Sequence, residues 1–414
     1  MKINKNKQSL IIAFVTILFW DLIEKYFPNC QFIILILLLL LNFKQIKKPI
    51  NNIFLIISLV VFIQGIFNVL LGNNNLLVFI IQYGSIIVSY LAFSCVIEQF
   101  GSKTIIEYYW KTSFIMSIFG CLEILFSLIN VSFATKLPLL FNNTNFYNRV
   151  VGVFPRIAAL CNEPSFLGYF LAPAVFLIIY SLINGKHEII TFNNKRRYIQ
   201  GLCILIVYLM SFSAVAYMGL VFMFVFIWLD KDVSWIKIIF PVLAIGFILI
   251  LYNKVPDFKM RIDDTYNLFF ANKLDSGSIN LSSYTYYSNF RVSIESIKST
   301  LGLGTGLGSY RYLFDKYNMG AWGASEIILN REDGNSLLFR IIAELGITGF
   351  VAVLFFLVYF LPKTKAEKVY GLALLSMFCM IIIRMGNYTH GGIWLYIVLY
   401  IKLWKESKSR FVGV

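Results

Sequence analysis

Long apolar runs follow one another along almost the entire chain, with short polar segments between them. The runs lie near residues 9–27, 30–43, 50–71, 76–97, 108–130, 163–184, 198–229, 235–252, 335–361, 367–386 and 391–404. A membrane-spanning helix needs about 20 apolar residues, so this pattern predicts an all-α, polytopic integral membrane protein. Composition agrees, because 59% of the residues are hydrophobic and only 14% are charged. We therefore expect residues 1–414 to form a single transmembrane domain.

Basic residues concentrate in a few of the polar segments and indicate which side of the membrane each segment faces. They occur in the N-terminal tail and at 44–48, 195–197, 362–368 and 405–410, which the positive-inside rule assigns to the cytoplasm. An even number of crossings must then separate 195–197 from 362–368, although only three runs lie between them. The run 198–229 is too long for one span, and Ser211 and Ser213 interrupt it, which predicts two short helices there. The chain then has about 12 transmembrane helices and both termini in the cytoplasm.

Two polar segments are predicted to face outward, an outer loop at 131–162 and a large extracytoplasmic loop at 253–334 that contains short helices. The second loop includes NFRVSIESIKSTLGLG, whose apolar spacing predicts an amphipathic helix around Arg291. Glycines then occupy every second position, at Gly302, Gly304, Gly306 and Gly308. They match neither a Walker loop nor the dinucleotide-binding spacing. Instead they predict positive φ angles and a backbone that closely approaches a ligand or a neighbouring helix.

The net charge of +15 does not indicate nucleic-acid binding, because the basic residues lie in short segments between apolar runs. The six cysteines have no CxxC spacing, and the two histidines lie far apart. We therefore expect neither a metal site nor a cofactor.

Arginines on the outward-facing side run against the positive-inside bias and need an explanation. They are Arg149, Arg156, Arg261, Arg291, Arg311, Arg331, Arg340 and Arg384. Guanidinium groups form paired hydrogen bonds to phosphate oxygens, and a lipid diphosphate is the phosphate available at this surface. Pairing with acidic residues of the same loops is the alternative for any single arginine.

An acidic residue, Glu163, lies where the first outer loop ends and the apolar run at 163–184 begins. In RIAALCNEPSFLGYFLAP, Pro164 suits the first turn of a helix and Glu163 directly precedes it. Glu163 either complements the helix dipole or faces a polar cavity as a base for a sugar hydroxyl. Glu123 and Glu344 are weaker candidates of the same kind.

These segments, in this order and on these sides, resemble the superfamily of O-antigen polymerases (Wzy-type) and O-antigen ligases. The matching pieces are Arg156 to Gly168, the turn at Ser211–Ser213, the Arg291 helix with LGLGTGLGSY, and DGNSLLFRIIAELGITGF. The resemblance implies a metal-independent glycosyltransferase of the bacterial inner membrane, with its active site facing the periplasm. Such a polymerase transfers a glycan from undecaprenyl diphosphate to another undecaprenyl-diphosphate-linked repeat unit, in O-antigen or capsule synthesis. Its partners would be these lipid-linked oligosaccharides, membrane lipids and a chain-length regulator protein.

The resemblance also implies roles for particular residues. Arg156 and Arg291, then Arg311 and Arg340, are the expected diphosphate ligands, and the four glycines supply loop backbone. Many family members have a His-Asn pair where this chain has Gly334-Asn335. That difference favours a polymerase over a ligase and leaves the general base open between Glu163, Asp333 and His390. A ligase and a polysaccharide or lipid transporter stay as alternatives, the transporter because of the break at Ser211–Ser213.

Overall fold

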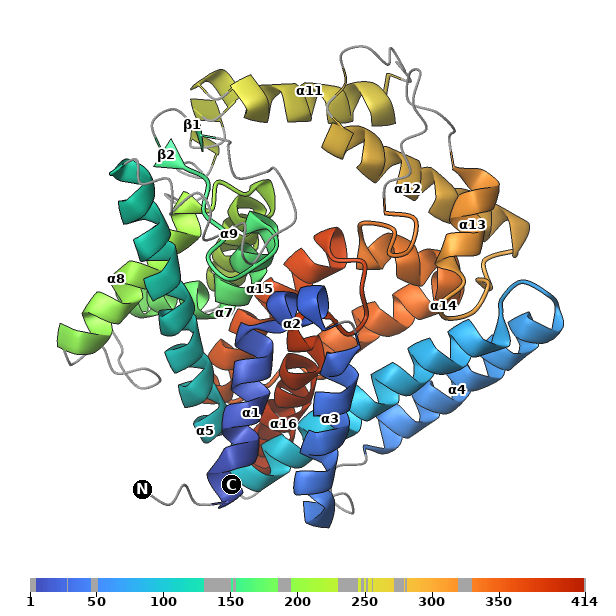
Figure 1. Cartoon of the computed structure of the whole chain (residues 1–414), viewed down its shortest axis with the longest axis horizontal. Coiled ribbons are helices and arrows are strands. Elements are labelled where there is room, and N and C mark those ends of the chain that lie inside the picture. Colours follow the sequence, from blue (N-terminus) through green and yellow to red (C-terminus); the bar gives the residue numbers. More distant parts are fainter. Residues whose placement is uncertain are drawn as a thin grey trace.

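The computed structural model describes residues 5–27, 29–45, 51–129, 150–151, 154–184, 195–229, 245–246, 249–250, 252–254, 256–271, 279, 281–318 and 330–412, and the structural statements below concern these residues. They form an α-helical molecule with one short antiparallel pair of strands, β1 (Val150–Val151) and β2 (Phe154–Pro155) (Figure 1). The helices and 3₁₀ turns are α1 (Lys5–Leu18), α2 (Trp20–Tyr26), α3 (Cys30–Leu41), η1 (Phe43–Gln45), α4 (Asn52–Leu70), α5 (Leu76–Leu128), α7 (Pro164–Asn184), α8 (Lys195–Met210), α9 (Ala214–Leu229), α11 (Pro256–Phe269), α12 (Leu281–Ser299), α13 (Tyr310–Tyr317), α14 (Leu337–Tyr359), α15 (Lys365–Arg384), η3 (His390–Gly392) and α16 (Ile393–Val412).

The predicted all-α membrane protein is confirmed at this level. Among the described residues, five helices are long and apolar enough to cross a membrane, namely α4, α5, α7, α14 and α15. The count of about 12 crossings stays a prediction. Most of the run at 235–252 and of the outer loop at 131–162 lies outside the described residues, as do 272–278 and 319–329 of the large loop.

Several of the apolar runs differ from single straight helices. The run at 198–229 divides into α8 and α9 at Ser211–Ser213, as the parity argument predicts. Its turn is held by the Ser211 hydroxyl, which donates to the Tyr208 carbonyl at 2.7 Å. The runs at 76–97 and 108–130 instead join into α5, which breaks at Gly101 with φ 76° and ψ 160°. Only glycine adopts these angles readily, so Gly101 marks the place where the chain changes direction.

Burial separates a central group of helices from a peripheral one. In the most apolar windows of α7 and α15, 72% and 61% of the residues are buried, against 11% in α4. Close packing inside the bundle depends on small residues, because a Cβ added at Gly168 of α7 would lie 2.9 Å from the Ala216 Cβ of α9. Helix α4 therefore lies at the edge, with apolar side chains exposed as in a helix that faces lipid.

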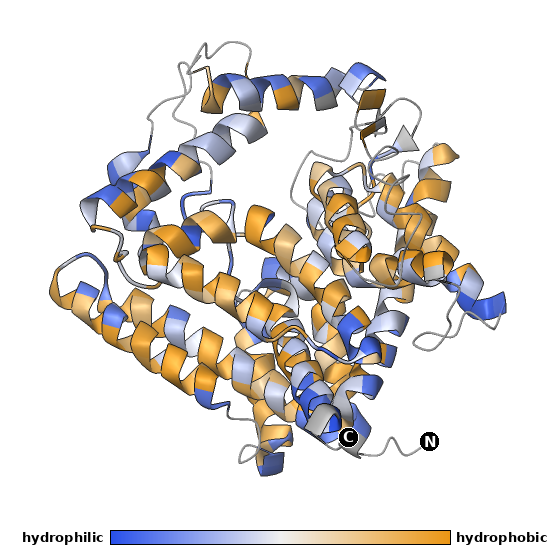
Figure 2. Cartoon of the chain, turned by 180° about the vertical axis from the view of Figure 1, so that it is seen from behind, coloured by the Kyte–Doolittle hydropathy of each residue, from blue (hydrophilic) through white to orange (hydrophobic). Residues whose placement is uncertain are grey.

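The two ends of the helix bundle differ in character. At one end the basic segments 362–368 and 405–410 meet, with Arg410 2.7 Å from Glu367, and Lys402 of α16 lies 2.9 Å from Glu98 of α5. The opposite end, around Pro164, Leu337 and Arg384, we call the loop end. Helices α11, α12 and α13 lie beyond it, and Figure 1 shows α11 along the top of the molecule and α12 and α13 below it toward the right side. Apolar residues dominate the bundle helices, whereas α11 is largely hydrophilic (Figure 2).

Candidate functional site

The glycine-rich loop between α12 and α13 packs against α14. Gly302, Gly304, Gly306 and Gly308 all have positive φ, between 77° and 89°, as predicted. A Cβ added at Gly304 would lie 2.5 Å from the carbonyl oxygen of Glu344 and from the nitrogen of Gly346. The Gly306 N–H donates to that same carbonyl at 2.7 Å. Of the two expected partners, the glycine backbone thus contacts a neighbouring helix, at the point where Gly346 interrupts α14.

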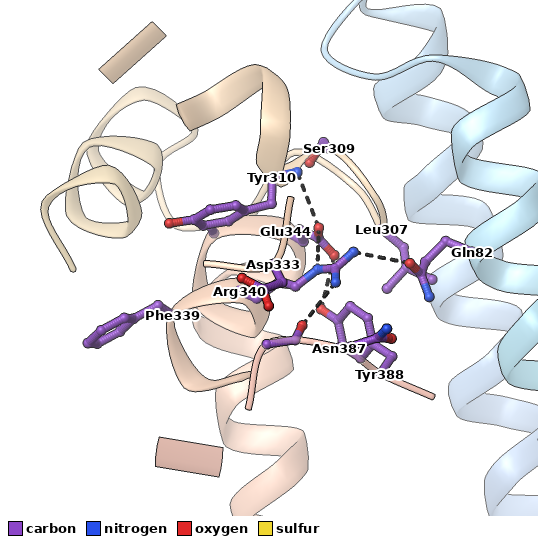
Figure 3. Close-up of polar contacts among 12 residues, drawn as sticks. Gln82, Leu307, Ser309, Tyr310, Asp333, Phe339, Arg340, Glu344, Asn387 and Tyr388 are labelled. Carbon is purple, nitrogen blue, oxygen red and sulfur yellow. Dashed lines mark hydrogen bonds and ion pairs between the residues drawn. The ribbon is translucent and has the colours of Figure 1, made fainter. Parts of the chain in front are cut away.

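Beside this loop lies a buried ion pair, formed by Arg340 and Glu344 one turn apart on α14. Their side chains are 7% and 0% exposed, and Arg340 Nε lies 3.0 Å from Glu344 Oε1. Figure 3 shows the pair between Tyr310, Tyr388 and Gln82, which come from three other parts of the chain. Glu344 accepts hydrogen bonds from the Tyr310 N–H at 3.2 Å and from the Tyr388 hydroxyl at 3.0 Å.

Arg340 is therefore fully engaged inside the protein. Besides Glu344, it donates from Nη1 to the Gly386 carbonyl at 2.9 Å and from Nη2 to Gln82 Oε1 at 3.1 Å. Its guanidinium also lies 4.7 Å from the Tyr388 ring centroid. Because all three guanidinium nitrogens have partners, this placement suits a structural role rather than the predicted role of diphosphate ligand.

A second acidic–basic pair at the loop end is partly open to solvent. Glu163 directly precedes α7, which begins at Pro164 as predicted, and its Oε2 accepts a hydrogen bond from the Ser165 hydroxyl at 2.9 Å. Arg384, at the end of α15, places Nη2 3.6 Å from the same Glu163 oxygen. The Arg384 and Glu163 side chains are 28% and 34% exposed, so both remain accessible to a ligand.

The turn before α14 contributes a third group to this pair. Arg384 Nη1 lies 3.5 Å from the Asn335 carbonyl oxygen, and Asn335 itself has φ 58°. Asp333 holds this turn, because its Oδ1 accepts hydrogen bonds from the Asn335 N–H and from the Asn330 side-chain amide, both at 3.0 Å. Asn335 is 4% exposed, and its Oδ1 has no hydrogen-bond partner among the described residues. The structure thus brings Glu163, Asn335 and Arg384 together, while Asp333 supports the turn.

Arg384 is the member of this site that the sequence did not single out. It was visible only as one of several arginines on the predicted outer side. Its distinguishing feature is its position at the end of an apolar run, which places it where α7 begins and α14 begins.

His390, a predicted base, lies in a buried acidic setting close to this site. Its Nε2 is 3.0 Å from Asp21 Oδ1 and its Nδ1 is 3.4 Å from Glu24 Oε2. Burial alone would lower the pKa of His390, but the charges and hydrogen bonds of Asp21 and Glu24 raise it to about 10. His390 is thus positively charged at neutral pH, and a charged imidazole cannot accept a proton. Of the three predicted bases, it fits the role least.

The His390 cluster also supports the entry to α7. The other oxygen of Asp21 accepts the Asn162 N–H at 2.6 Å, one residue before Glu163. Asp21, Glu24 and His390 bring potential metal-ligand atoms within 4.8 Å of one another. However, each ring nitrogen lies within ion-pair distance of its own carboxylate, which is the arrangement expected of a protonated imidazole.

The other predicted diphosphate ligands have separate surroundings. Arg291 is exposed on α12. Arg311, on α13, donates to the Tyr312 hydroxyl at 2.7 Å and lies over the Tyr312 ring. Arg156 is partly buried, and the next residue, Ile157, donates its N–H to the Met210 carbonyl at the end of α8.

Among the described residues, the arrangement of Glu163, Asn335 and Arg384 is suited to chemistry on an anionic ligand. Arg384 supplies a partly exposed cation, Glu163 a partly exposed carboxylate, and Asn335 an unpaired amide oxygen. Comparison with known proteins adds no assignment: no protein-family model matches the chain, and no curated protein has a significantly similar sequence.

Proposed function

We propose that this protein is a polymerase of lipid-linked oligosaccharide repeat units, with Arg384 and Glu163 at its active site. The observation that carries the proposal is the partly exposed Glu163–Arg384 pair, 3.6 Å apart at the loop end of a helical membrane protein. The family resemblance supplies the substrate class, a glycan on undecaprenyl diphosphate. The same site would serve a ligase only with a different acceptor, and no observation favours that acceptor.

The reaction requires one bond exchange and one proton transfer. A hydroxyl oxygen of the acceptor sugar attacks the anomeric carbon of the donor, and the bond from that carbon to the diphosphate oxygen breaks. The hydroxyl proton passes to the Glu163 carboxylate, which acts as general base. Undecaprenyl diphosphate leaves with an additional negative charge, which the Arg384 guanidinium stabilises through paired hydrogen bonds.

Arg384 takes the role that the sequence assigned first to Arg156 and Arg291. Arg384 contacts the candidate base directly, so a single ligand can touch both groups. Arg291 is exposed on α12 and could contact the glycan or the second lipid. Asp333 would act through the turn that it holds, as a positioning residue.

The proposal includes the finer topology, with about 12 crossings, cytoplasmic termini and an active site on the outer face of the bacterial inner membrane. Two observations support it. The basic segments 362–368 and 405–410 meet at the end of the bundle opposite Arg384, through the Arg410–Glu367 pair. The division of 198–229 into two helices is the arrangement that the predicted sidedness of the chain requires.

The test is polymerisation of a lipid-diphosphate-linked repeat unit by purified protein, read as a ladder of glycan lengths. We expect Arg384→Ala to lower the rate by about 10²- to 10³-fold, as for loss of a donor that stabilises charge in a transition state. Glu163→Gln should lower it by about 10²- to 10⁴-fold. The matched control is Arg331→Ala, an arginine on the same side that pairs with Asp315 instead. Equal activity in all three variants would refute the assignment of the site.

A further inference from the structure

Two adjoining apolar cavities lie between α4 and the helices α14 and α16. Their volumes are about 230 Å³ and 340 Å³. Both are bordered by the same side chains from the three helices, among them Phe54 and Val61 of α4, Val353 of α14 and Trp394 of α16. Because they share these walls, we treat the two cavities as one groove and call it the α4–α14 groove.

One end of the groove reaches the apolar surface of the molecule. Ile56 and Val60 line the larger cavity, and they are 63% and 60% exposed. These residues belong to α4, one of the helices long and apolar enough to span a membrane. A hydrocarbon chain can therefore enter the groove sideways from the bilayer.

The other end of the groove lies beneath the candidate site. Leu337, Ile382 and Tyr388 line the smaller cavity. Leu337 follows the turn that holds Asn335, and Ile382 is two residues before Arg384. The Ser336 hydroxyl donates to the Ile382 carbonyl at 3.0 Å, which fixes these two segments side by side. A lipid chain at this end would therefore have its head group close to Arg384.

The walls suit hydrocarbon and offer few polar groups. Those that line the groove are largely paired, as with the Ser58 and Tyr83 hydroxyls at 2.5 Å and the Gln64 amide, which donates to the Leu303 carbonyl at 2.6 Å. A cavity of about 150 Å³ holds benzene, so by proportion the groove accommodates roughly 20 carbon atoms, or about four isoprene units. Leaving it empty would forfeit the dispersion contacts of its walls.

We infer that the α4–α14 groove binds the isoprenoid chain of a polyprenyl diphosphate, with the diphosphate at Arg384. The identity of this lipid rests on the proposed function. The groove itself rests on the cavities and on their continuity from the lipid-facing surface to the candidate site. Transfer of a chain from bilayer to groove has no hydrophobic gain, so head-group binding at Arg384 must supply the selectivity.

The test is photo-crosslinking of the full-length protein in lipid nanodiscs to a polyprenyl diphosphate that carries a diazirine on its chain. We expect labelled peptides from α4 and α14, and competition by unlabelled polyprenyl diphosphate but not by phosphatidylglycerol. Val353→Trp and Val61→Trp fill the groove from opposite walls and should each reduce labelling about tenfold. The matched control is Val351→Trp on α14, because Val351 is 56% exposed and lines neither cavity.

Thermal unfolding of all three variants shows whether the two groove variants are folded like the control. Labelling only of segments that do not line the groove, equal labelling of groove and control variants, or equal competition by phosphatidylglycerol would each overturn the inference. The glycan ladder reports separately on the proposed function. Selective labelling without a ladder would support lipid binding in the groove and contradict the polymerase function. A ladder that neither groove variant changes would support the polymerase function and contradict lipid binding in the groove.

Discussion

Removing both members of the buried Arg340–Glu344 pair should destabilise the protein by less than the two single removals added together. The variant Glu344→Leu leaves the Arg340 guanidinium buried, 7% exposed, without its counter-charge. Breaking a buried pair in this way costs about 3–5 kcal/mol. It also removes the acceptor of the Tyr310 N–H and the Tyr388 hydroxyl, and each orphaned group adds about 1–3 kcal/mol if water does not reach it.

The double variant Arg340→Leu/Glu344→Leu removes both charges. It orphans the Gly386 carbonyl and the Gln82 side-chain oxygen in addition to the two Glu344 donors, but no unpaired charge remains. We therefore expect the loss in its free energy of unfolding to be smaller than the sum of the losses in the two single variants. The coupling energy in the double-mutant cycle should be about 2–3 kcal/mol, the upper part of the range measured for residues in contact.

The assay is unfolding of wild type, both single variants and the double variant in mixed micelles titrated with denaturing detergent. Circular dichroism at each step reports the loss of helix. Additive single-variant effects, or a Glu344→Leu variant as stable as wild type, would refute the structural role of this pair. A stable Arg340→Leu variant without polymerase activity would return Arg340 to the list of diphosphate ligands.

Two further predictions concern the glycine loop and His390. Gly304→Ala should lower the thermal midpoint of unfolding much more than Gly72→Ala does. Both glycines have positive φ, but only a Cβ at Gly304 would meet backbone atoms, at 2.5 Å. Equal shifts in the two variants would contradict the packing of the loop against α14. The raised pKa of His390 implies that its charged form adds stability that is complete below about pH 6.5 and is lost as the pH rises through about 10. The difference in thermal midpoint between wild type and His390→Gln should therefore shrink over that range, and a difference that grows with pH would exclude a protonated His390 between Asp21 and Glu24.

Local patterns were sufficient to predict much of the helical architecture. The turn at Ser211–Ser213 followed from the length of one run and the sidedness of its neighbours. The positive φ angles of the loop glycines followed from their spacing, since alternate glycines cannot continue a helix. Pro164 at the start of α7 followed from its fixed φ.

Contacts between distant segments could not be predicted in the same way. The sequence predicts that Arg340 binds a diphosphate. In the structure its side chain donates to Gln82 of α5, which is 258 residues away. No local pattern around Arg340 predicts that contact. The pairing of His390 with Asp21 and Glu24 of α2 could not be predicted either, because these two acidic residues have the spacing of ordinary helix-surface residues. For Arg384, the sequence predicted a positive charge at the end of an apolar helix. Its position beside Glu163 depends on the packing of α7 against α15, which the sequence does not predict.

Purified wild-type protein is sufficient to test the proposed polymerisation of lipid-linked repeat units. The protein would be incubated with a lipid-diphosphate-linked repeat unit in the presence of a chelator and without nucleotide. Glycan lengths and released undecaprenyl diphosphate would be quantified together. The account predicts a ladder and one lipid diphosphate released for each unit joined. Folded protein that forms no ladder and releases no lipid diphosphate from its native repeat unit would contradict it.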